Sequence, residues 1–138
     1  MILDKLFRFR DYVFYRMHTK YSKTGETGIF SPVIFLVTLD GALCIPLIFL
    51  FLKIFPLSDG WDYLPFVATA IILLILNCKR YYKKGKAVEI IKTYKHSKYN
   101  KIFPDWTMTA LAFVCILGGF ACIKPVSMIY KYITSLFA

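Results

Sequence analysis

The chain has 138 residues, of which 58% are hydrophobic, and it carries 18 Lys and Arg against eight Asp and Glu. This length fits one domain, and a mean hydropathy of +0.57 is too apolar for an ordinary soluble protein. Because the positive charge lies in blocks between long apolar runs, the composition argues against a nucleic-acid-binding protein and indicates a membrane protein with several spans.

The N-terminal segment 2–18 predicts an amphipathic helix. Its apolar side chains recur at spacings of three and four residues, as they do along one face of a helix; they are Ile2, Leu6, Phe9, Val13 and Met17. Tyr12, Phe14 and Tyr15 suit the lipid head-group layer. We therefore expect this helix to lie in the cytoplasmic interface as an anchor, with a docking surface for a partner as the alternative.

Three apolar runs have the length of a membrane-spanning helix, which rises about 1.5 Å per residue across about 30 Å of hydrocarbon; the first is long enough, and the other two are near the lower limit. They are residues 30–52, 61–78 and 106–123. Pro46 lies inside the first run, and because proline lacks a backbone donor it predicts a kink near this residue.

The orientation of the three spans follows from the basic residues around them. Six precede the first run, nine lie between the second and third runs, and only three lie on the opposite side. Positively charged loops stay in the cytoplasm. The sequence therefore predicts a multi-pass protein of a bacterial inner (cytoplasmic) membrane, with its N-terminus in the cytoplasm and its C-terminus outside.

The loop at 79–103 is the most basic part of the chain, and residues 86–98 predict an amphipathic helix. A Lys or Arg close to an anionic leaflet contributes about 1 kcal/mol to membrane binding. The residues expected to contact anionic lipid are Lys79, Arg80, Lys83, Lys84 and Lys86. No phosphate-binding loop or aromatic RNA-binding motif is present, so no nucleic-acid partner is expected.

Residues 126–138 are too short to span a membrane and predict a short amphipathic helix on its outer surface. The expected fold is therefore an all-α membrane protein. It has three transmembrane helices, with amphipathic interfacial helices at the N-terminus, in the cytoplasmic loop and at the C-terminus.

The third run carries a stripe of small side chains with spacings of three, four and three residues. The stripe consists of Ala112, Cys115, Gly119 and Cys122. Small residues let membrane helices approach closely. We expect the stripe to pack against the first or second span, with contact between two copies of the chain as the alternative.

Asp40 stands inside the first run, where a carboxylate costs about 3 kcal/mol at the centre of a span. Counted from Phe30 it is about 15 Å deep, which matches residues 68–69 of the second run and makes Thr69 its polar neighbour. None of the runs contains Lys, Arg or His, so no intramolecular salt bridge is expected. Three hypotheses remain: Asp40 is protonated and hydrogen-bonded to Thr69 or Thr38, it faces water on a proton or cation path, or it pairs with a cation of another protein. The first is favoured.

The sequence contains no motif for catalysis, a metal or a cofactor, and the expected protein is not an enzyme. The loop segment Lys92–Lys101, KTYKHSKYNK, together with its flanking spans, resembles small bacterial three-span membrane proteins, some of which are taken to be toxin-immunity proteins. This resemblance implies a protein that binds a protein partner, as an immunity protein or as an accessory subunit of a membrane complex. The alternative is a homo-oligomeric channel or proton-linked transporter that uses Asp40.

Overall fold

The computed structural model describes residues 2–26, 28–55 and 60–136, and all regular secondary structure in these ranges is helical. The expected all-α class is therefore confirmed for these ranges. The helices are α1 (Ile2–Lys23), α2 (Phe30–Ile54), α3 (Leu64–Tyr81), α4 (Lys86–Tyr94), α5 (Tyr99–Ile102), α6 (Trp106–Ala121) and α7 (Ile123–Leu136).

Three helical segments are long and apolar enough to cross a membrane, as in a multi-pass membrane protein. They are Phe30–Ile54, Leu64–Tyr81 and Trp106–Tyr132. The second begins three residues later than predicted, with Pro65 in its first turn. Proline suits that place because the first backbone N–H groups of a helix have no partner inside it.

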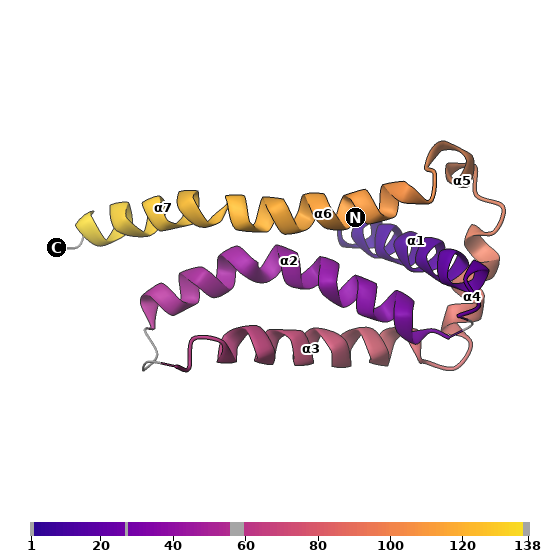
Figure 1. The fold of residues 1–138 in the computed structure, drawn as a ribbon, viewed down its shortest axis with the longest axis horizontal. Coiled ribbons are helices and arrows are strands. Elements are labelled where there is room, and N and C mark those ends of the chain that lie inside the picture. The colour runs from indigo at the N-terminus through magenta and orange to yellow at the C-terminus, as the bar shows by residue number, and fades with distance from the viewer. Residues whose placement is uncertain (1, 27, 56–59, 137–138) are drawn as a thin grey trace.

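The three spans form a layer one helix thick, with α2 in the middle. α2 packs on α3 along one side and on α6 and α7 along the other, as Figure 1 shows. Within the described ranges the backbones of α3 and α6 do not come into contact. α2 remains helical through Pro46 and is bent along its length (Figure 1).

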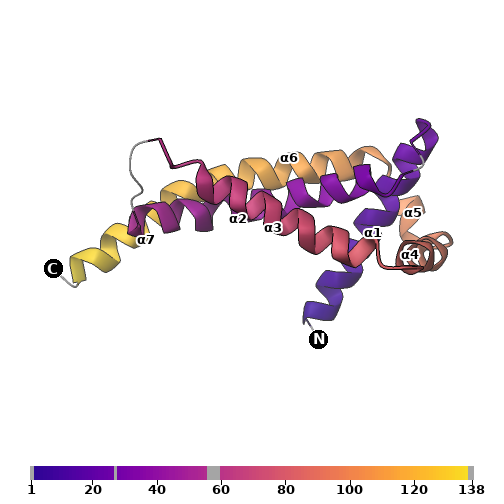
Figure 2. The same cartoon turned by 90° about the horizontal axis from the view of Figure 1, so that it is seen from below.

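α1 does not run alongside the three spans but crosses their layer at one end, as Figure 2 shows. Both ends of α1 project from the layer, and its middle part is enclosed. All seven residues from 11 to 17 are buried, although they cover every side of the helix. The prediction that Tyr12, Phe14 and Tyr15 face lipid head groups is therefore wrong, because these rings pack against other helices of the same chain.

The hydrophobic core lies around this enclosed part of α1. Phe14 stacks on Tyr81 of α3 with the ring centroids 4.3 Å apart. Both side chains are fully buried, together with Val33 and Leu36 of α2. Aromatic stacking and apolar burial thus join α1 to two of the spans.

The basic loop forms two short helices, α4 and α5, in place of the single helix predicted for residues 86–98. α4 begins after Gly85, which has a φ of 81°, a conformation that favours glycine. Ala87 and Ile90 bury the apolar face of α4, which packs on α1 and α3. The loop is therefore folded onto the end of the three-span layer.

The C-terminal helix differs from the one predicted at 126–138. α7 begins at Ile123 and continues nearly in line with α6, as Figure 1 shows. The Val126 N–H donates to the Cys122 carbonyl at 3.1 Å, so helical hydrogen bonding crosses the junction. α7 also packs on α2, and the Lys53 ammonium donates to the Ser127 hydroxyl. The third candidate span consequently extends to Tyr132.

Candidate functional site

Most of the charged and aromatic side chains that interact across helices lie at the end of the layer formed by α1, α4 and α5; the exceptions include Lys53 with Ser127 and Phe49 with Phe66. We call this end of the layer the basic end, because the nine basic residues of the loop lie there. Three groups of polar contacts join α1 to the spans at this end, and a cavity lies beside them.

The first group is the Asp40 triad, which consists of Arg10, Asp40 and Asn77. The Arg10 Nη2 donates to Asp40 Oδ2 at 2.6 Å and to Asn77 Oδ1 at 2.9 Å. The Asn77 Nδ2 donates to Asp40 Oδ2 at 3.1 Å and to the Leu73 carbonyl at 2.9 Å. The side chains of Arg10 and Asp40 are 21% and 15% exposed, and Asn77 is buried. The triad therefore joins α1, α2 and α3 through one shielded ion pair.

This geometry corrects two predictions about Asp40. An intramolecular salt bridge does exist, because its cation comes from α1 rather than from a span. Its amide neighbour is Asn77 and not Thr69, and the Thr38 hydroxyl donates to the Ile34 carbonyl instead. The favoured hypothesis gave Asp40 only neutral hydrogen-bond partners, whereas the structure places the Arg10 guanidinium and the Asn77 amide against it.

The depth assigned to Asp40 from the sequence was wrong for a geometric reason. The prediction assumed that the first residue of the first span and the last residue of the second lie at the same depth. Asp40 was therefore expected level with residues 68–69. In the structure Asp40 lies beside Asn77, one turn before the end of α3. The first turns of α2 therefore extend beyond the end of α3, and Asp40 lies level with the last turns of α3.

The second group joins α1 to the end of α3. The Arg80 guanidinium binds both carboxylate oxygens of Asp11 at 3.0 Å, and the Tyr81 hydroxyl donates to Asp11 at 3.2 Å. The Arg80 guanidinium also lies over the ring of Phe7, 4.5 Å from its centroid. A bidentate pair with a cation–π contact fixes the position of this arginine. Arg80 thus has fixed partners within the chain, and its contact with anionic lipid stays a prediction.

The third group joins α1 to the start of α6. The buried Arg16 donates to Asp105 at 2.6 Å and to the Asn100 carbonyl at 3.2 Å. Lys23 donates to the other oxygen of Asp105 at 3.0 Å, and Lys20 donates to the Thr109 hydroxyl at 2.8 Å. α1 thus has polar contacts with each of the three spans.

The Asp105 carboxylate makes the contact between α1 and α6 sensitive to acid. The hydrogen bond from Lys23 holds the pKa of Asp105 below its ordinary value of 3.8, although partial burial acts in the opposite direction. A carboxylate whose pKa is lower in the folded state stabilises that state above the unfolded pKa, and the stabilisation is lost as the pH falls through the folded pKa. We expect the melting temperature in detergent to fall below about pH 3.8 less steeply in Asp105→Asn than in the original chain. Equal slopes for the two proteins would contradict this contribution.

The other basic residues expected to contact lipid are placed differently from Arg80. Lys79, Lys83 and Lys84 are exposed near the end of α3. Lys86 donates to Glu89 within α4 at 3.2 Å. The three exposed lysines therefore remain available to an anionic surface.

Of the small stripe on α6, Ala112 and Gly119 are buried, Cys115 is half-buried and Cys122 is exposed. Gly119 faces the backbone of α2 so closely that a Cβ added to it would lie 2.4 Å from the Ala42 carbonyl oxygen. At Gly119 the small stripe therefore faces α2.

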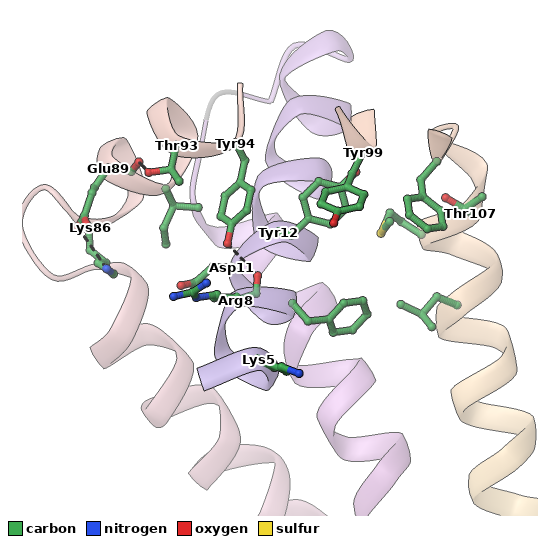
Figure 3. A pocket seen from close by; sticks show the side chains of 15 residues that line it. Lys5, Arg8, Asp11, Tyr12, Lys86, Glu89, Thr93, Tyr94, Tyr99 and Thr107 are labelled. Carbon is green, nitrogen blue, oxygen red and sulfur yellow. Dashed lines mark hydrogen bonds and ion pairs between the residues drawn. The ribbon is translucent and has the colours of Figure 1, made fainter. Parts of the chain in front are cut away.

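A cavity of about 920 Å³ lies between α1, α4, α5 and α6. Figure 3 shows three tyrosines over its upper part, Tyr12 from α1, Tyr94 from α4 and Tyr99 from α5. We call it the tyrosine cavity. Its volume falls within the range of about 300–1,000 Å³ that is typical of small-molecule sites. The sequence did not predict this cavity, because it exists only where α1 crosses the layer.

No protein-family model matches this chain, and no curated protein or solved structure is significantly similar to it. The described residues contain no group of three or more His, Cys, Asp or Glu that could hold a metal ion. Function is therefore inferred from the geometry of the helices and of the basic end.

Proposed function

We propose that this chain is a non-enzymatic membrane protein that binds a protein partner, either as a toxin-neutralising immunity protein or as an accessory subunit of a membrane complex. The proposal includes location in a bacterial inner membrane, with the basic end in the cytoplasm. The distribution of basic residues along the sequence supports this orientation.

The observation that carries the proposal is the open, one-helix-thick layer of spans. α3 and α6 each pack against α2 but not against each other, and so the described spans surround no internal path. Large apolar side chains stay exposed on the outer faces of α3 and α6, among them Ile71, Ile75, Phe113, Leu117 and Phe120. Within a membrane such faces contact lipid or the helices of another protein. Asp40, the residue that suggested conduction, is held in an ion pair with Arg10.

Native mass spectrometry of the protein, gently extracted from its own membrane, tests this proposal. We expect a foreign subunit at fixed stoichiometry. A photo-crosslinking residue at Leu117 on α6 or at Ile75 on α3 should join that subunit to the chain, because both positions are exposed within candidate spans. A crosslinker at Val88, which is exposed on α4 outside the spans, is the control for contact at the basic end.

Two results would contradict partner binding. A monomer that carries only lipid, with no crosslinked protein at either span position, would leave the exposed faces to the bilayer. A pure homo-oligomer with ion flux that Asp40→Asn abolishes would instead support the channel. In that case Asp40 would have to leave Arg10 during conduction.

A further inference from the structure

We propose that the tyrosine cavity binds one molecule of an acidic phospholipid, and this inference does not depend on the proposed protein partner. The lipid's anionic head group would contact basic side chains of α1, and one of its acyl chains would lie on the apolar wall. The proposal goes beyond general attraction between the basic loop and an anionic leaflet, because it assigns one lipid to one preformed site.

The shape and lining of the cavity fit an amphiphile rather than a small polar ligand. Apolar side chains from three segments form its wall, Phe9 from α1, Phe103 from the connection after α5, and Met108 and Leu111 from α6. Figure 3 shows the Tyr12 and Tyr99 rings between the α4 side and the α6 side of the cavity. A wall of this kind excludes water and favours a hydrocarbon chain.

The charges on the lining favour an anionic head group. Lys5 and Arg8 line the cavity from α1, and Lys86 lines it from α4. Two carboxylates are present as well, but Asp11 is bound by Arg80 and Glu89 accepts from Lys86. The acidic groups are therefore matched by Arg80 and Lys86, and Lys5 and Arg8 add positive charge to the lining.

A buried hydroxyl without an acceptor for its proton is an independent sign that the site receives a ligand. Tyr12 is only 8% exposed, and its hydroxyl has no acceptor for its proton among the described residues, because the nearby Arg16 guanidinium can only donate. Buried hydroxyl groups are nearly always hydrogen-bonded. A phosphate or ester oxygen of a lipid in the cavity would supply the missing acceptor. Tyr94 does not need one, because its hydroxyl donates to the Arg8 carbonyl at 3.1 Å.

The test is a lipid titration of the purified, delipidated full chain, followed by native mass spectrometry. The two probes are phosphatidylglycerol and phosphatidylcholine with identical acyl chains. We expect one phosphatidylglycerol to bind saturably and more tightly than phosphatidylcholine. Arg8→Gln should weaken its binding about fivefold, the factor that corresponds to about 1 kcal/mol for one basic residue near an anionic lipid.

Matched variants on α6 and α1 locate the bound lipid. Leu111→Trp should weaken the saturable binding by placing a larger side chain on the wall where the acyl chain lies, whereas Leu117→Trp, at an exposed position of the same helix, should leave it unchanged. Tyr12→Phe should weaken lipid binding but keep the thermal stability of the lipid-free chain, since the hydroxyl donates to no described residue.

Three results would overturn the proposal. Equal affinity for the two lipids would remove the head-group contact with Lys5 and Arg8. Binding that is unchanged in Leu111→Trp would indicate lipid at the outer surface only. A photo-crosslinking residue at Tyr12 that captures a protein segment, in a chain that binds no phosphatidylglycerol, would assign the cavity to a peptide.

Discussion

Asp40→Asn is expected to lower the free energy of unfolding by about 3 kcal/mol, because loss of one partner leaves the other charge of a shielded ion pair uncompensated. Arg10 would keep its positive charge where it is only 21% exposed. Arg10 and Asn77 both donate to Asp40 Oδ2, a place that the amide oxygen of asparagine can take, and so the change removes the negative charge rather than the acceptor. The measurement is equilibrium unfolding of the purified chain in mixed detergent micelles with increasing dodecyl sulfate.

A double-mutant cycle measures the interaction energy between Arg10 and Asp40 separately from the other effects of replacing each side chain. Arg10→Gln should be destabilising by a similar amount, and the double variant Arg10→Gln/Asp40→Asn should be more stable than the sum of the two single changes predicts. Asp62→Asn is the control, since Asp62 is an exposed acid on the connection between α2 and α3. It should have no measurable effect.

Asp40→Asn also distinguishes the ion pair from the protonated Asp40 that the sequence suggested. A protonated carboxyl group has one hydrogen-bond donor and one acceptor oxygen, as an amide group has. Asp40→Asn would therefore leave the free energy of unfolding nearly unchanged if Asp40 were protonated. An unchanged free energy of unfolding, together with additive effects in the cycle, would therefore contradict the charged triad.

The partner of Asp40 could not be predicted from the spans, because they contain no Lys, Arg or His. The residue that pairs with it is 30 positions earlier, on a helix that was expected to lie flat on the membrane. A signal was present nonetheless. Arg10 follows Leu6 by four residues and precedes Val13 by three, and so it falls on the apolar face of α1. A cation that is buried on such a face needs a carboxylate or another hydrogen-bond acceptor on the helix that packs against it.

The number of spans was predictable because the apolar length needed to cross a bilayer is a property of each segment alone. The position of α1 was not, because an amphipathic pattern shows that one face is buried without showing what buries it. The residues from Asp11 to Met17 are buried on all sides, which only the crossing of α1 over the layer explains. The ion pair of Arg80 with Asp11 could not be predicted for the same reason, since it depends on where α1 lies.

The small stripe on α6 was a more informative pattern, because close helix approach needs small side chains at a specific spacing. The sequence could not show which helix approaches or which member of the stripe makes the closest contact. The structure places Gly119 against the Ala42 carbonyl, whereas an added Cβ at the adjacent Gly118 would have nothing within 4 Å. Two neighbouring glycines thus have different packing roles.

Gly119→Ala is accordingly expected to destabilise the folded chain by about 1–3 kcal/mol, because overpacking at a close contact forces the helices apart. The new methyl group would lie 2.4 Å from the Ala42 oxygen, a backbone atom that cannot rotate away as a flexible side chain can. The measurement is the unfolding titration in mixed micelles used for Asp40→Asn.

Gly118→Ala is the matched control, since it adds the same methyl group to the same helix one residue earlier. It should be neutral or slightly stabilising, because alanine favours the helical conformation more than glycine does and space is open at this position. If Gly119→Ala were instead as stable as Gly118→Ala, α2 and α6 would not be in the close contact described. If both variants kept the monomer folded but Gly119→Ala dissolved a homodimer, the stripe would serve contact between two copies of the chain. A loss of stability confined to Gly119→Ala in the monomer therefore assigns this part of the stripe to packing between α2 and α6.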